Sequence, residues 1–92
     1  MSEAPPNFTQ QWIDSPDPAM ILLNQQFGTL TPRQLQVAAM LALGRTNASI
    51  ARELGISVKT VDTHRQDIML KLELANNVEL ARAALRVGLV TL

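Results

Sequence analysis

With 92 residues, 47% of them apolar, the chain can build one small domain with a modest core and leaves little room for a second. It contains no cysteine, which excludes disulfide bridges and thiolate metal sites and suits a reducing cytoplasm. The formal net charge is zero, but residues 1–29 carry three acids and no base, while residues 30–92 carry eight bases and five acids. The second part therefore has a net charge of +3 (eight minus five), which permits binding to phosphate without establishing it.

Residues 1–29 are predicted to form a partly flexible leader. The longest apolar run of the leader, Ala19–Leu23, is far too short to cross a membrane, so we expect a soluble cytoplasmic protein without a membrane partner. A short helix can begin after Asp17, with Pro18 at its first position and Gly28 just past its end. This segment either covers part of the main core or offers a docking surface to a partner or a second copy. The side expected to be buried consists of Met20, Leu23 and Phe27.

The first helix of residues 30–92 is predicted from unusually complete end signals. Thr31 can cap it, Pro32 suits its first position, and Gln34 completes a capping box. Gly44 ends this helix. It is broadly apolar and therefore a core helix, through Leu35, Ala38, Ala39, Met40, Leu41 and Ala42.

Two further helices follow with a very short connection. Asn47 is expected to cap a helix over 48–54 that ends at Gly55, and Ser57 is expected to cap a long helix over 58–72. Because the connection is so short, the two helix axes must cross steeply. This pattern is typical of a helix-turn-helix unit, whose second helix enters the DNA major groove, although any three-helix bundle with a tight corner can show it. The inside of the corner is expected to contain Ile50, Leu54, Ile56 and Val61.

The helix over 58–72 has two unlike faces. One face carries Val61, His64, Ile68 and Leu72, and the other carries Lys59, Asp62, Thr63 and Gln66. An acid near DNA is repelled by phosphate, so three alternatives stay open for Asp62. It forms an ion pair with Lys59 or Arg65 at helical spacing, it accepts a hydrogen bond from a cytosine, or it contacts only solvent.

A last helix is predicted over 78–87, capped by Asn76 or Asn77 and ended by Gly88. Leu80, Ala84 and Val87 form one apolar stripe, and Val78, Ala81, Leu85 and Leu89 form a second stripe that we expect to mediate dimerisation. The alternative is that the leader covers the excess apolar surface and the protein is a monomer.

Residues spread over three of the predicted helices match one known pattern in register: Leu30, Thr31, Pro32, Arg33, Val37, Gly44, Asn47, Ile50, Ala51, Leu54, Ser57, Thr60, Val61, His64, Ile68, Lys71 and Leu72. Through them the chain resembles the LuxR-type (FixJ/NarL-type) helix-turn-helix domain from Leu30 to about Val87. The resemblance implies an all-α, four-helix domain of a bacterial transcription regulator, here preceded by a short leader with room for one extra helical segment. The third helix of the family reads DNA and the fourth commonly serves dimerisation. Gln34 departs from the family, which usually has Glu there, and the chain looks like a stand-alone member without a regulatory domain.

The resemblance also implies which residues contact DNA. Base and backbone contacts of the family fall at the positions of Lys59, Thr60, Asp62, Thr63 and Gln66, with Lys71 facing phosphate at the far end. The set expected to contact DNA also includes Arg65, Asn47 and Ser57.

We therefore expect a sequence-specific regulator of transcription that binds double-stranded DNA as a homodimer, with the helix over 58–72 in the major groove. The alternative is a protein-binding adaptor on the same scaffold that engages another regulator without reading DNA. RNA polymerase or another regulator stays open as a further partner.

We expect no enzymatic activity, no cofactor and no metal, because no serine or threonine has a base and an orienting acid, no glycine-rich phosphate loop exists, and the single histidine lacks ligand partners. His64 is expected to pack on the core side, with a ring nitrogen bonded to a backbone or phosphate oxygen. Trp12 is expected to be a lid over the core rather than a stacking platform for single strands.

Overall fold

The computed structural model describes residues 18–91, which form five α-helices and no strand. The all-α fold class with one helix in the leader is confirmed. The expected roles of Asp17 as a cap and of Trp12 as a lid lie outside the described residues. No helix within the described part of the chain has the length and apolarity needed to cross a bilayer. The elements are α2 (Pro18–Gly28), α3 (Pro32–Ala42), α4 (Asn47–Leu54), α5 (Val58–Leu72) and α6 (Asn77–Val87).

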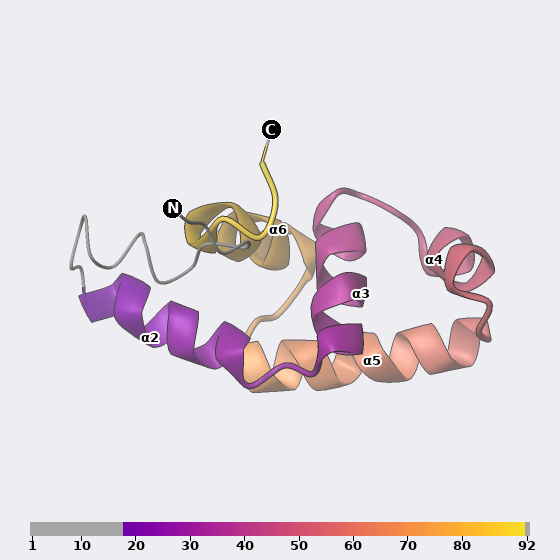
Figure 1. Cartoon of the computed structure of the whole chain (residues 1–92), viewed down its shortest axis with the longest axis horizontal. Helices are drawn as coiled ribbons and strands as arrows, with labels where there is room; N and C mark the ends of the chain where they lie inside the picture. Colours follow the sequence, from indigo (N-terminus) through magenta and orange to yellow (C-terminus); the bar gives the residue numbers. More distant parts are fainter. Residues whose placement is uncertain (1–17, 92) are drawn as a thin grey trace, which may run out of the picture.

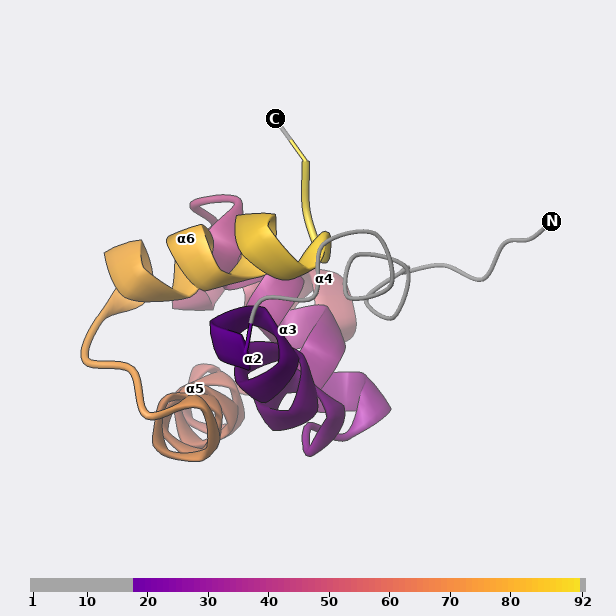
Figure 2. The same cartoon turned by 90° about the vertical axis from the view of Figure 1, so that its left-hand side faces the viewer.

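Helix α3 is the centre of the arrangement, because it stands between α6 and α5 and packs against both (Figure 1). α4 packs on the N-terminal half of α5, and α2 covers the other side by contacting α5 and α6. Figure 2 shows α6 above and α5 below, with α2 and α3 between them. The largest fully buried side chains come from all five helices: Phe27, Val37, Ile50, Val61, Ile68, Leu72, Leu80 and Val87.

The start of α3 has the predicted capping box. Gln34 N donates to Thr31 Oγ1, and Thr31 N donates to Gln34 Oε1, both at 3.1 Å. Gln34 therefore performs the capping role that a glutamate could perform, and its side chain is buried. The chain then leaves α3 through Gly44, whose φ of 88° lies in the left-handed region.

The predicted cap of α4 is wrong by one residue. Thr46, not Asn47, is the N-cap: its hydroxyl accepts from Ser49 N at 3.1 Å, and its backbone is extended. Asn47 is instead the first helical residue. Both residue types cap helices well, so two such residues in a row leave the start of the helix undefined by one position.

The corner between α4 and α5 is built as predicted. Gly55 adopts a left-handed conformation with φ of 69°, and Ile56 N returns to Ala51 O at 3.0 Å. Ser57 caps α5 by accepting from Thr60 N at 3.0 Å. Among the corner residues Ile50 and Val61 are fully buried, and Leu54 and Ile56 are half-buried.

The far end of α6 and its cap also agree with the sequence analysis. Asn76 caps the helix by accepting from Glu79 N at 2.9 Å, and Gly88 ends it in a left-handed conformation.

α2 extends through Gly28 rather than ending before it, and places Phe27 in the core with no exposed surface. The division into a leader of residues 1–29 and a domain of residues 30–92 stays a prediction.

One tertiary link joins the α2–α3 junction to α5. The ammonium of Lys71 donates to Thr29 O at 3.2 Å and to Gln34 Oε1 at 2.9 Å. The Gln34 oxygen thus accepts from Thr31 N and from Lys71 at the same time. This link fixes the C-terminal half of α5 against the beginning of α3.

Candidate nucleic-acid interface

The outer edge of α5 is the candidate surface. Val61, Ile68 and Leu72 bury one side of the helix against the core, so the opposite side faces outward along the lower edge of the molecule in Figure 1. Met69, which the sequence analysis did not assign to the buried face, is only 9% exposed. α5, the second helix of the steeply crossing pair α4 and α5, therefore has an outward polar face.

Lys59 is the charged residue of this face best placed to bind a ligand. It is exposed in the first turn of α5, and within the described residues its ammonium has no hydrogen-bond or ion-pair partner. Thr63 and Gln66 are exposed on the same face, at spacings of four and seven residues from Lys59. A free cation beside side chains that donate and accept hydrogen bonds suits both phosphate contact and base reading.

Asp62 does not form the ion pair that was one of its three alternatives. Its carboxylate accepts a hydrogen bond from Gln66 Nε2 at 2.8 Å, one turn further along α5. Arg65 instead donates through Nε to Asn77 Oδ1 at 3.1 Å. Arg65 is thus engaged in a tertiary contact, and the neutral amide of Gln66 is the group that bonds to the Asp62 carboxylate.

Three hydroxyl groups at the start of α5 are engaged locally. The Ser57 and Thr60 hydroxyls share a hydrogen bond of 2.8 Å, and Thr63 Oγ1 donates to Lys59 O at 3.1 Å. All three residues are exposed. These bonds fix the hydroxyl orientations and still leave lone pairs for a ligand.

Two expected contact residues have a different setting. Lys71 is exposed, but its ammonium is engaged with Thr29 and Gln34, so its first role is structural. Asn47 lies half-buried at the start of α4, on a different helix from the other candidates. The structure therefore brings Lys59, Asp62 and Gln66 together on one face and leaves these two at its margin.

Val58 belongs to this surface and was missed by the sequence analysis. It is the first residue of α5, and 50% of its surface is exposed. It precedes Asp62 and Gln66 by four and eight residues, and this helical spacing was the signal that could have revealed it. An exposed methyl group at such a position can contact the methyl group of thymine.

His64 is half-buried on the flank of α5, and the ring makes no hydrogen bond within residues 18–91. The predicted core position is thus only partly correct. Of the two predicted partners of the ring, a backbone oxygen is not bonded among the described residues, and a phosphate oxygen stays a prediction. Among the described residues, no group of three or more histidine and acidic side chains is close enough to hold a metal ion.

The two apolar stripes of α6 have different environments. Leu80, Ala84 and Val87 are fully buried, whereas 64% of Val78 and 37% of Leu85 are exposed. Ala81 and Leu89, which complete the stripe expected to dimerise, are half-buried. Val78 and Ala81 also border a hollow of about 300 Å³ that reaches to the end of α3 at Leu41 and Ala42.

The sequence matches known proteins over the part that contains these helices. The profile of the family described as "Bacterial regulatory proteins, luxR family" matches residues 28–84. The chain is 44% identical over 63 residues to the uncharacterized response regulatory protein YgeK of Escherichia coli (strain K12), a match that covers 68% of this chain and 43% of that protein.

Two further relatives extend this finding. The transcriptional regulatory protein UhpA of E. coli (strain K12) is 48% identical over 68 residues, which cover 74% of this chain and 35% of UhpA. The oxygen regulatory protein NreC of Staphylococcus haemolyticus is 41% identical over 63 residues, which cover 68% of this chain and 29% of NreC. The matched segments thus amount to less than half of each of these relatives. No solved structure gives a significant match.

Proposed function

Because the chain belongs to the luxR family of bacterial regulatory proteins, we propose that it is a transcription regulator that binds double-stranded DNA sequence-specifically, with α5 in the major groove. The observation that carries the proposal is the outer face of α5, where Lys59 is exposed beside Gln66 and Thr63 and has no partner among the described residues. Recognition of DNA needs both phosphate contacts and groups that reach base edges, and this face supplies both. The names of the relatives UhpA and NreC, which describe them as regulatory proteins, support the same role.

The residues of this face have separate roles in the proposal. Lys59 binds phosphate, Gln66 and Asp62 face base edges, and Val58 packs against a thymine methyl group. The hydroxyls of Ser57, Thr60 and Thr63 accept or donate to the backbone of the duplex while keeping their local bonds. Three further contacts at the margin of this face belong to the proposal, through Asn47, Arg65 and Lys71.

The protein is further proposed to bind as a homodimer through the exposed stripe of α6, on a site with two-fold symmetry. Val78 is the most exposed residue of this stripe and stands beside the hollow next to Ala81. In a two-fold contact, the same surface of each copy covers the other, so Val78 of one copy can pack into the apolar hollow beside Ala81 of the other copy. Such a dimer would place two copies of α5 on one duplex.

The test of DNA binding is a fluorescence anisotropy titration of a random duplex at several salt concentrations. Each phosphate contact adds about −0.9 to the slope of log affinity against log salt, so the slope should be clearly negative. Lys59→Ala should make the slope less negative by about 1 for each bound copy. Arg33→Ala is the matched control, because it removes one exposed positive charge from α3 rather than from α5 and should leave the slope unchanged.

Selection of bound sequences from a random pool then tests specificity. Gln66→Ala should relax the preference at one base position in each half-site, at a cost of about 1–3 kcal/mol on the selected sequence. Undetectable binding to every duplex would reject the proposal and favour the protein-binding adaptor. Binding with a steep salt slope but no selected sequence would retain DNA as the partner and reject base reading.

A further inference from the structure

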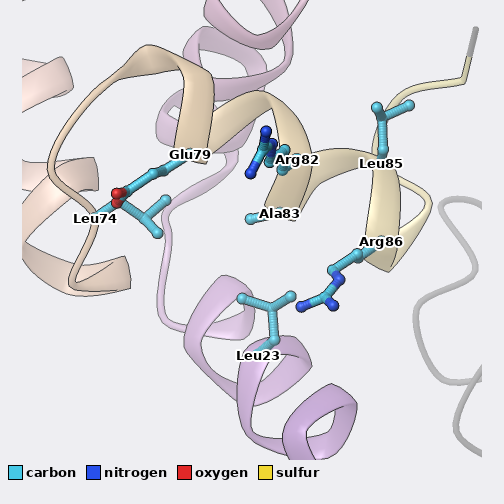
Figure 3. Close-up of a pocket in the computed structure, with 7 residues that line it drawn as sticks. All are labelled: Leu23, Leu74, Glu79, Arg82, Ala83, Leu85 and Arg86. Carbon is cyan, nitrogen blue, oxygen red and sulfur yellow. The ribbon is translucent and has the colours of Figure 1, made fainter.

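A groove between α2 and α6 lies apart from the outer face of α5. Its volume is about 480 Å³, and Leu23 of α2, Leu74 of the α5–α6 connection and Ala83 of α6 give it an apolar lining. Arg82 and Arg86 of α6 border it (Figure 3). Figure 3 shows the Arg86 side chain extending from α6 toward Leu23.

The charges around this groove are not balanced by the described residues. Arg82 and Arg86 stand one turn apart on the same helix, so their like charges lie close together. Neither of them makes an ion pair or a hydrogen bond within the described residues. The acid that borders the groove, Glu79, uses its carboxylate to accept from Ala75 N at 2.8 Å. An apolar hollow beside two free cations suits an acidic segment that carries a large apolar side chain.

The chain contains a segment with this chemistry. Residues 1–17 carry three acids and no base, together with Phe8, Trp12 and Ile13. The segment is joined directly to α2, one wall of the groove, and Leu23 lies only about 8 Å along the helix axis from Pro18. The six residue-to-residue steps from Trp12 to Pro18 can span about 20 Å, so Trp12 can reach the groove. A tether of this length gives an effective concentration on the order of millimolar.

We propose that residues 1–17 dock onto the α2–α6 groove of their own chain, with Trp12 against the apolar lining and Asp14 and Asp17 facing Arg82 and Arg86. Leu85 borders this groove and also belongs to the stripe proposed to dimerise, so docking in cis and dimerisation compete for this residue. Docking in cis does not depend on DNA binding, and it can be tested without DNA.

Trp12 is the only tryptophan, so the intrinsic tryptophan fluorescence of the full chain reports on this residue alone. Its emission maximum should lie at a shorter wavelength than that of a synthetic peptide of residues 1–17, and acrylamide should quench it less. Arg82→Glu with Arg86→Glu should shift the emission to that of the peptide. The matched control is Arg33→Glu with Arg52→Glu, which changes the charge equally at two exposed arginines outside the groove. Circular dichroism checks that each variant keeps its helices.

A charge exchange separates direct contact from a general effect of charge. Asp14→Lys with Asp17→Lys, added to the double arginine variant, should restore the short-wavelength emission. Emission equal to that of the peptide in the unmodified chain would overturn the proposal. So would an emission shift that disappears on dilution, because the segment would then dock on a second copy. A shift that survives the double arginine variant would also overturn it, because Trp12 would be buried elsewhere.

Discussion

Asp62 keeps a negative charge on the face of α5 that is proposed to meet DNA. The hydrogen bond from Gln66 orients the carboxylate without neutralising it, because the amide carries no charge. The same bond holds the Gln66 side chain in one direction, which lowers the entropy that it would lose on reading a base. If α5 binds DNA as proposed, the acid weakens the attraction to every duplex while it positions the Gln66 side chain.

Asp62→Asn should raise the affinity for all duplexes, because one repulsive charge leaves the interface. The stability of the fold should change by only a few tenths of a kcal/mol, since the asparagine oxygen can still accept from Gln66 on an accessible helix face. Anisotropy titrations on the selected site, on its single-base variants and on random duplex measure the first effect, and urea unfolding measures the second. Glu73→Gln, which removes an exposed acid at the C-terminal end of α5, is the matched control.

The pattern of the gain tells two roles of Asp62 apart. A uniform gain on all sequences means that the acid only repels phosphate. A change of preferred base at one position of each half-site means that it accepts from a cytosine. An unchanged affinity on every duplex would place Asp62 outside the interface.

At the scale of the helix ends, local chemistry was almost sufficient to predict the structure. The capping box at Thr31 and Gln34, the left-handed Gly55 and the cap at Ser57 depend only on residues within one turn, and each is formed. The α4 cap was misplaced because Thr46 and Asn47 offer nearly equal capping chemistry. The structure selects Thr46, whose backbone is extended, and Asn47 is the first helical residue.

Exchange of these two residues for alanine should confirm the position of the cap. Thr46→Ala should lower the free energy of unfolding by about 1 kcal/mol, because Ser49 N loses its acceptor. Asn47→Ala should be neutral or stabilising by a few tenths of a kcal/mol, because alanine favours the helix interior. Urea unfolding of both variants measures the difference. The opposite order of stability would identify Asn47 as the cap in solution.

Across the whole molecule, apolar spacing predicted most of the buried residues, although it missed Met69 and placed the half-buried His64 on the core side. The contacts between distant residues were not predictable in this way. Arg65 could reach Asp62 at helical spacing, yet it bonds to Asn77 twelve positions away. Lys71 was expected at phosphate and bonds to Gln34, which is 37 positions away. Long polar side chains have several partners within reach, and only the packed arrangement of the helices selects one.

The exposed stripe of α6 leads to a prediction on assembly. The mass measured by light scattering should rise from monomer toward dimer with concentration, and Val78→Glu with Leu85→Glu should keep the protein monomeric, because two charges would be buried in the contact. Leu70→Glu is the control, since Leu70 is 79% exposed on α5 and away from this stripe. A monomer mass at high concentration, unchanged by the α6 substitutions, would exclude the interface.

The side-chain oxygen of Gln34, which accepts from both Thr31 N and Lys71 Nζ, couples the first turn of α3 to the C-terminal end of α5. Fraying of the first turn of α3 would break the bond from Thr31 N, and movement of the Gln34 side chain would also break its bond with Lys71 of α5. Helix ends normally open with little cost, but here the opening of one end also breaks a hydrogen bond to a second helix. The beginning of α3 and the end of α5 should therefore exchange their amide hydrogens as one cooperative unit. The free energy of local opening at the C-terminal end of α5 is then limited by the stability of the α3 cap.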